Sequence, residues 1–155
     1  MTTYTLLKFA HIISAAVLFG TGIGIAYFML TAHLSRNIEA MRVVMRNVIL
    51  SDWIFTGTAV VVQPLTGAVL MFHAGWSPDS IWFKWVVALY LAVGACWIPV
   101  VVLQYRMARL VREAANYETL DPTYHRAFRA WLLLGAPAFV MVLALYALMI
   151  FRPGL

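Results

Sequence analysis

A histidine and a lysine interrupt the apolar segment from Tyr4 to Tyr27, where Lys8 and His11 are three residues apart. As an α-helix rising about 1.5 Å per residue, this segment is long enough to cross a hydrocarbon core of about 30 Å. An ionisable side chain in that core is costly unless it is paired, so His11 is a candidate ligand or proton-transfer group. A hydrogen-bonded core histidine is the alternative, and Lys8 can extend its ammonium group to the membrane surface.

Two further nitrogen-bearing side chains, His73 and Lys84, lie near the ends of apolar segments, and Trp82 and Trp85 flank the lysine. A membrane helix bundle with few histidines and many aromatic residues can hold a flat apolar cofactor by one or two nitrogen ligands, and haem b meets that description. We expect His11 to be an axial ligand, with Lys84 or His73 opposite it and the two tryptophans lining the pocket. As alternatives, Lys84 can extend to the surface and His73 can remain solvated at the water boundary.

The composition places these candidates in a membrane. Of 155 residues, 64% are hydrophobic and 11% are charged, and the mean hydropathy is +0.87, which is too apolar for a soluble domain. The net charge of +5 comes from basic residues in the linkers, so we interpret it as a topology signal rather than as a nucleic-acid surface. A signal peptide is not expected, because Met1 to Thr5 carries no side-chain charge and the apolar segment is too long.

Four segments have the length and hydropathy of transmembrane helices. They run from about Tyr4 to Met29, Ile49 to Phe72, Ile81 to Leu103 and Ala130 to Ile150. Short linkers between such spans favour antiparallel neighbours. The sequence therefore predicts an all-α, integral membrane four-helix bundle with up-down-up-down topology, formed by residues 1–155 as a single domain.

The charged linkers predict the orientation of this bundle. Arginines concentrate in the first and third linkers: Arg36, Arg42, Arg46, Arg106, Arg109, Arg112, Arg126 and Arg129. The hairpin His73 to Ser80 carries only one acid, Asp79. By the positive-inside rule, the arginine-rich linkers are cytoplasmic, and the hairpin and both termini are periplasmic. We therefore expect a multi-pass protein of the bacterial inner membrane.

Polar and small residues predict which helix faces are buried. Asp52, Thr56, Gln63, Thr66 and His73 fall within about 100° of one another on a helical wheel, so they should form a polar stripe facing the bundle interior. Glycines recur at positions 20, 22 and 24, where we expect close helix packing rather than a dinucleotide site.

Three segments carry a resemblance to a known family. LLKFAHIISAAVLF, which contains His11, is similar to the first helix of the bacterial membrane protoporphyrinogen oxidase family, with its L-K-x-x-H-I-I segment. QPLTGAVLMF and IWFKW continue the resemblance. It implies a four-helix core holding haem b through His11 and, in the third helix, Lys84, and it favours Lys84 over His73. The chain departs from that family after Tyr90, where no histidine follows.

The whole chain more closely resembles a family of uncharacterised bacterial integral membrane proteins. The resemblance rests on QPLTG, WIPVVVLQ and RAWLLLGAPAF, and it implies a fold but no activity.

Three functions follow from these observations. The first is a haem b redox protein that oxidises a porphyrinogen-like substrate or passes electrons to quinone. The second is a non-catalytic accessory or assembly subunit whose small-residue faces bind partner helices or a second copy. The third is an oligomeric proton-conducting protein that uses Asp52, Gln63 and His11 as a polar path.

Overall fold

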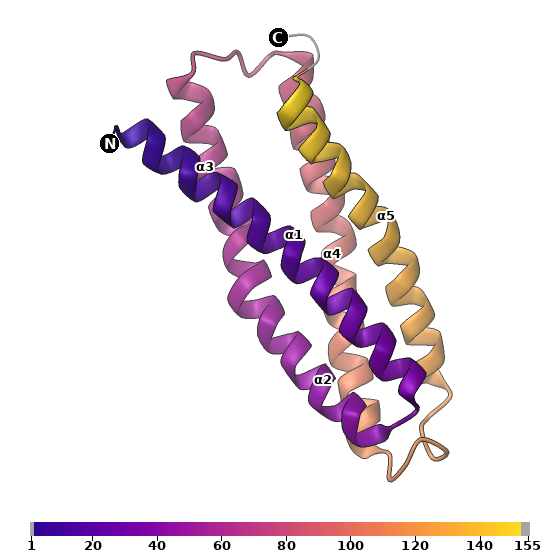
Figure 1. Ribbon diagram of the computed structural model, residues 1–155. Helices are drawn as coiled ribbons and strands as arrows, with labels where there is room; N and C mark the ends of the chain where they lie inside the picture. Colours follow the sequence, from indigo (N-terminus) through magenta and orange to yellow (C-terminus); the bar gives the residue numbers. More distant parts are fainter. Residues whose placement is uncertain (1, 153–155) are drawn as a thin grey trace.

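The computed structural model describes residues 2–152, and within that range every regular element is helical. The elements are α1 (Thr3–Ser35), α2 (Ile38–Ser51), the π-helix η1 (Asp52–Gly57), α3 (Thr58–His73), α4 (Ile81–Glu113) and α5 (Thr123–Phe151) (Figure 1). Because α2, η1 and α3 follow one another without a break, they form one long helix, and four helices are long and apolar enough to cross a membrane. The predicted all-α four-helix architecture is confirmed, while residues 1 and 153–155 of the predicted domain lie outside the described range.

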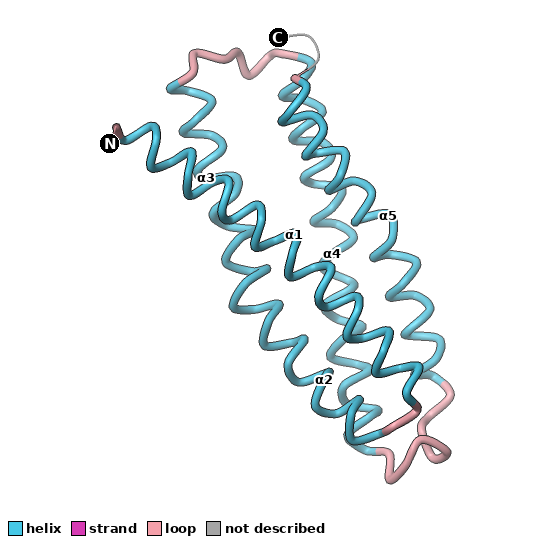
Figure 2. The backbone as a smooth tube through the Cα atoms, viewed as in Figure 1, coloured by secondary structure: helices cyan, strands magenta, loops and turns pink. Residues whose placement is uncertain are grey.

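Successive helices run in opposite directions. Both ends of the described chain and the α3–α4 connection lie at one end of the molecule, which we call the terminal end (Figure 2). The α1–α2 and α4–α5 connections lie at the opposite end, which we call the linker end. The orientation of the bundle in the membrane stays a prediction.

Local capping sets the helix boundaries. Arg36 adopts a left-handed conformation with φ of 51°, which ends α1. The side chain of Asn37 then accepts hydrogen bonds from the amides of Glu39 and Ala40 at 3.0 and 3.1 Å, so α2 begins at once. Ser80 caps α4 in the same way by accepting from the Phe83 amide at 3.3 Å. The two-residue connection makes α1 and α2 antiparallel neighbours.

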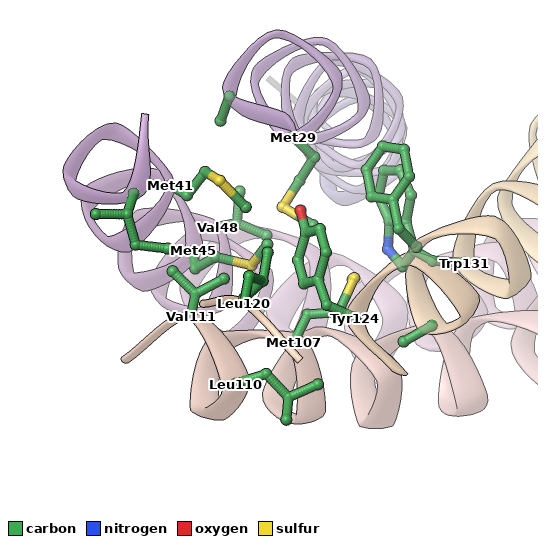
Figure 3. Packing of buried hydrophobic residues seen from close by; sticks show 14 of the residues in the cluster. Met29, Met41, Met45, Val48, Met107, Leu110, Val111, Leu120, Tyr124 and Trp131 are labelled. Carbon is green, nitrogen blue, oxygen red and sulfur yellow. The ribbon is translucent and has the colours of Figure 1, made fainter. Parts of the chain in front are cut away.

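The helices extend beyond the predicted spans at the linker end, where the arginine-rich segments are largely helical. Four methionines, Met29, Met41, Met45 and Met107, pack there around Tyr124, and all five side chains are almost fully buried (Figure 3). Flexible thioether side chains fill irregular space between helices. All four long helices therefore meet at the linker end. This packing explains why the helices extend beyond the apolar segments that the sequence identifies as membrane spans.

The helices are paired differently along their length. Toward the terminal end α1 packs on α3 and α4 packs on α5, and the ribbon shows the two pairs diverging (Figure 1). Phe19 of α1 stacks on Phe139 of α5 with ring centroids 5.3 Å apart, which links the pairs near mid-bundle. His11 on α1 is therefore positioned by α3.

We expected the glycines at positions 20, 22 and 24 to allow close helix packing, and this prediction is wrong for contacts within the chain. A Cβ atom added to Gly20, Gly22 or Gly24 would meet nothing within 4 Å. Gly20 and Gly24 lie on one side of α1 and Gly22 on nearly the opposite side, and none of them is at a helix crossing within the described residues.

Candidate cofactor site

His11 lies between α1 and α3, where it takes part in a small polar network. Its Nδ1 atom is 2.8 Å from Oγ1 of Thr66. The Gln63 side-chain amide donates to the His11 carbonyl oxygen at 2.8 Å and to the Ser14 hydroxyl at 2.6 Å. Residues of α1 and α3 are thereby joined inside an apolar pair of helices.

The Thr66 hydroxyl determines which imidazole nitrogen carries the proton. Thr66 has one hydroxyl proton, and its Oγ1 lies 2.7 Å from the Val62 carbonyl oxygen, to which it donates. Its oxygen can then only accept from His11, so Nδ1 of the neutral imidazole is the N–H donor. The Nε2 atom keeps its lone pair and has no hydrogen-bond partner among the described residues. A histidine oriented through Nδ1 with a free Nε2 has the arrangement of a typical metal ligand.

Gly67 allows this arrangement because it leaves room for the ring. A Cβ atom at position 67 would lie 3.2 Å from Cε1 of His11, which is tighter than an ordinary contact. The threonine-glycine pair of α3 thus has two roles at His11: Thr66 orients the ring and Gly67 makes space for it.

The other predicted site residues lie apart from this network. Lys84 and Trp85 are exposed at the start of α4, on the other pair of helices. His73 is exposed, and its Nδ1 pairs with the Val69 carbonyl oxygen of its own helix at 3.0 Å. No hydrogen bond of the described residues joins His11 to Lys84 or to His73, so their roles as ligands stay predictions.

Trp82 has a structural contact that accounts for its burial. Its Nε1 donates to the Leu148 carbonyl oxygen of α5 at 2.7 Å, and its ring packs edge-on against Trp76 with centroids 5.4 Å apart. Trp82 therefore holds α4 against α5 at the terminal end.

The predicted polar stripe is divided in the structure. Gln63 and Thr66 face α1, as described above, whereas Asp52 and Thr56 are buried nearer mid-bundle. His73 at the end of the stripe is exposed. The π-helix η1 changes the phase of the helix at Asp52, which a regular helical wheel does not include.

Two residues beside Asp52 were not among the candidates from the sequence. Trp97 and Gln104 of α4 line one cavity with Asp52, and Gln104 is only 1% exposed. They are seven residues apart, a spacing that places both on one helix face. The sequence feature that could have identified them is a glutamine seven residues after a tryptophan in an otherwise apolar segment.

Among the described residues, no group of three or more His, Cys, Asp or Glu side chains is arranged to hold a metal ion. This finding concerns sites built from protein ligands alone, whereas a haem iron needs only one or two axial ligands.

Comparison with known proteins identifies a family for the chain. Residues 5–153 match the model of a family described as "Predicted integral membrane protein (DUF2269)". No curated protein and no solved structure matches the chain.

Proposed function

The chain belongs to the DUF2269 family of predicted integral membrane proteins, and we propose that it is a haem b redox protein of the bacterial inner membrane. In this proposal Nε2 of His11 is an axial ligand to the iron. Porphyrin-like compounds or quinone are the proposed reaction partners. Its multi-pass character is supported directly by the family and by the four apolar helices.

The observation that carries the proposal is the orientation of His11. Thr66 holds Nδ1 at 2.8 Å, so the free lone pair is on Nε2. Imidazole in this tautomer is a strong ligand for haem iron, and the hydrogen bond at Nδ1 raises its basicity.

His11 supplies one nitrogen donor of the kind that haem iron takes as an axial ligand. His11 lies toward the terminal end, where the α1–α3 pair separates from the α4–α5 pair (Figure 1). When bound, haem b supplies one-electron transfer. The residues of this chain orient the ligand through Thr66, hold the His11 carbonyl through Gln63 and leave space at Gly67.

The second ligand is proposed to be Lys84 or, in its place, His73. Both lie at the terminal end with His11, in α4 and α3 respectively, with Trp82 and Trp85 near the start of α4. The exposed ammonium group of Lys84 can also pair with a haem propionate. The arginine-rich linkers at the opposite end support a periplasmic position for the terminal end.

The test is the visible spectrum of detergent-purified protein from haem-replete cells and after reconstitution with hemin. We expect a Soret band that falls or shifts in His11→Ala. His33→Ala is the matched control, because His33 lies at the linker end, where its Nδ1 pairs with Tyr124 at 3.3 Å. A colourless wild-type protein after reconstitution would contradict the proposal.

A second candidate function is an accessory subunit that binds a partner helix or a second copy. Gly20 and Gly24 favour it, because they lie on one side of α1 with open space beyond them, and small residues let a foreign helix approach closely. Cross-linking from Gly20→Cys in membranes, with Leu133→Cys on an exposed face of α5 as control, distinguishes a specific contact from random collision.

A further inference from the structure

Four polar side chains meet in the middle of the bundle, away from His11. The carboxyl group of Asp52 is surrounded by the side chains of Thr56, Trp97 and Gln104. Asp52 is 5% exposed, Thr56 7% and Gln104 1%. We call these four residues the Asp52 cluster.

Each residue of the Asp52 cluster has a buried polar atom without a hydrogen-bond partner. These atoms are Oδ2 of Asp52, Oγ1 of Thr56, Nε1 of Trp97 and Oε1 of Gln104. A buried unpaired polar group costs about 1–3 kcal/mol, so four of them in one place call for an occupant that pairs them.

The backbone at this point is also irregular. Asp52 and Thr56 lie in η1, where the hydrogen bonds of the long helix change to the π pattern. π-Helical turns inside α-helices are frequent at functional sites. Here Thr56, four residues after Asp52, lies beside the Asp52 carboxyl, and Asp52 lines a cavity with Trp97 and Gln104 of α4.

A cavity of about 170 Å³ adjoins the cluster, and Asp52, Trp97 and Gln104 line it together with apolar residues of α2 and α4. This volume exceeds that needed for a water molecule, but the exposed lining is almost entirely apolar, so the cavity adjoins the cluster without exposing its polar atoms. Trp53 and Tyr105 are also in its wall, where Trp53 Nε1 donates to the Tyr105 hydroxyl at 2.7 Å.

The chemistry of the four unpaired atoms determines whether a metal cation, an anion or a proton fits the cluster best. The Trp97 N–H is a donor, which disfavours a metal cation, and only three oxygens are available where hard cations need six or more. The Asp52 carboxyl disfavours an anion. A proton on Asp52 pairs the groups best, because the resulting O–H can donate to Oε1 of Gln104 while Trp97 and Thr56 donate to the carboxyl oxygens.

No lysine, arginine or histidine among the described residues forms an ion pair with Asp52, and the other titratable group lining the cavity is the Tyr105 hydroxyl. An ionised Asp52 would therefore be an uncompensated charge within the membrane span.

We propose that the Asp52 cluster is a proton-binding site, in which Asp52 carries one proton that exchanges with a water molecule reaching its carboxyl group. The step is a reversible proton transfer: the O–H bond of the carboxylic acid breaks, a water molecule accepts the proton, and the carboxylate remains until it is protonated again. The site is separate from His11 and does not depend on haem.

Infrared spectroscopy of purified protein in lipid nanodiscs tests this site. We expect a carboxylic acid C=O band at pH 7 that is lost in Asp52→Asn and kept in Asp79→Asn, whose carboxyl is exposed. The band should shift in D₂O, because the proton exchanges, and Gln104→Leu should move it further, because the acceptor of the O–H is removed.

A second measurement keeps the test decisive if Asp52→Asn does not fold. The chain has three aspartates, at positions 52, 79 and 121. In the Asp79→Asn, Asp121→Asn double variant labelled with ¹³C-carboxyl aspartate, the isotope-shifted band belongs to Asp52 alone. A carboxylate band instead of an acid band at pH 7 would overturn the proposal, as would an acid band that does not respond to D₂O.

Discussion

His11 and Thr66 form a directed hydrogen bond across the α1–α3 contact: Nδ1 donates to Oγ1 at 2.8 Å, and Thr66 in turn donates to Val62. Because a hydroxyl has a single proton, this relay fixes the imidazole tautomer. The Thr66–Val62 hydrogen bond within α3 therefore determines that Nε2 of His11 carries the free lone pair.

Thr66→Val is predicted to weaken the haem site without removing its ligand. Valine has nearly the shape of threonine but cannot accept from Nδ1, so the ring is free to change tautomer and to rotate. Loss of such an outer-shell contact typically reduces metal-ligand affinity by about 10–100-fold. Hemin titration followed at the Soret band measures the change.

Thr58→Val is the matched control for that change. Thr58 donates to the Ile54 carbonyl oxygen at 2.6 Å, the same local contact that Thr66 makes, but it is exposed and remote from His11. Equal hemin affinity in the two variants would show that the hydroxyl of Thr66 does not orient the ligand.

Gly67→Ala is predicted to displace the His11 ring. The added Cβ would approach Cε1 to 3.2 Å, so the ring or α3 must shift by a few tenths of an ångström. We expect a loss of stability of about 1 kcal/mol from overpacking together with an altered Soret maximum. Thermal unfolding and the visible spectrum give the two readouts.

Gly94→Ala provides the comparison for Gly67→Ala. No atom lies within 4 Å of a Cβ at position 94 in α4, and alanine is the better helix former by about 1 kcal/mol. This variant should be neutral or stabilising. If both alanine variants behave alike, the close approach of His11 to Gly67 has no consequence.

The sequence predicted the helices and part of the site. Hydropathy identified the four spans, because lipid-facing residues dominate each one. The wheel of α2 and α3 also placed Gln63 and Thr66 on one inward face, and both contact α1. His73, in the same helix, is exposed at the end of α3. The π-helix separates Asp52 and Thr56 from the phase of the later stripe residues, which a regular period cannot anticipate.

The pairing of helices could not be predicted from periodicity. Trp97 and Gln104 become notable only when α4 is placed against Asp52, and that placement depends on contacts between segments far apart in the chain. Lys84 and His11 were expected to meet because their depths in the membrane agree. Depth does not specify which helices are neighbours, and α1 packs on α3 at this end.

Arg42→Met is predicted to loosen the linker end. The Arg42 side chain donates to the carbonyl oxygens of Val111 and Ala114 where α4 ends, and it also pairs with Glu39. Charged hydrogen bonds of this kind contribute about 1.5–3 kcal/mol, and a cation at a helix C-terminus adds to them.

Hydrogen–deuterium exchange over residues 110–117 measures this effect. Exchange should be faster in Arg42→Met and unchanged in Arg46→Met, because Arg46 is exposed and makes no side-chain hydrogen bond among the described residues. If the exchange rate of these residues were the same in both variants, the contacts of Arg42 with Val111 and Ala114 would have no stabilising role.

The final prediction concerns the orientation of the bundle. Both chain ends and the α3–α4 connection share the terminal end, and the arginine-rich segments share the linker end, so one measurement at each end fixes the topology. In a Cys96→Ala background, a membrane-impermeant maleimide should label Ser77→Cys in spheroplasts. It should label Glu118→Cys, which is exposed in the α4–α5 connection, only after lysis. The reason is that arginines next to a span resist translocation.

The reverse pattern would move His11, His73 and Lys84 together to the cytoplasmic side. Their common depth would then be unchanged, but any electron acceptor would have to approach from the cytoplasm.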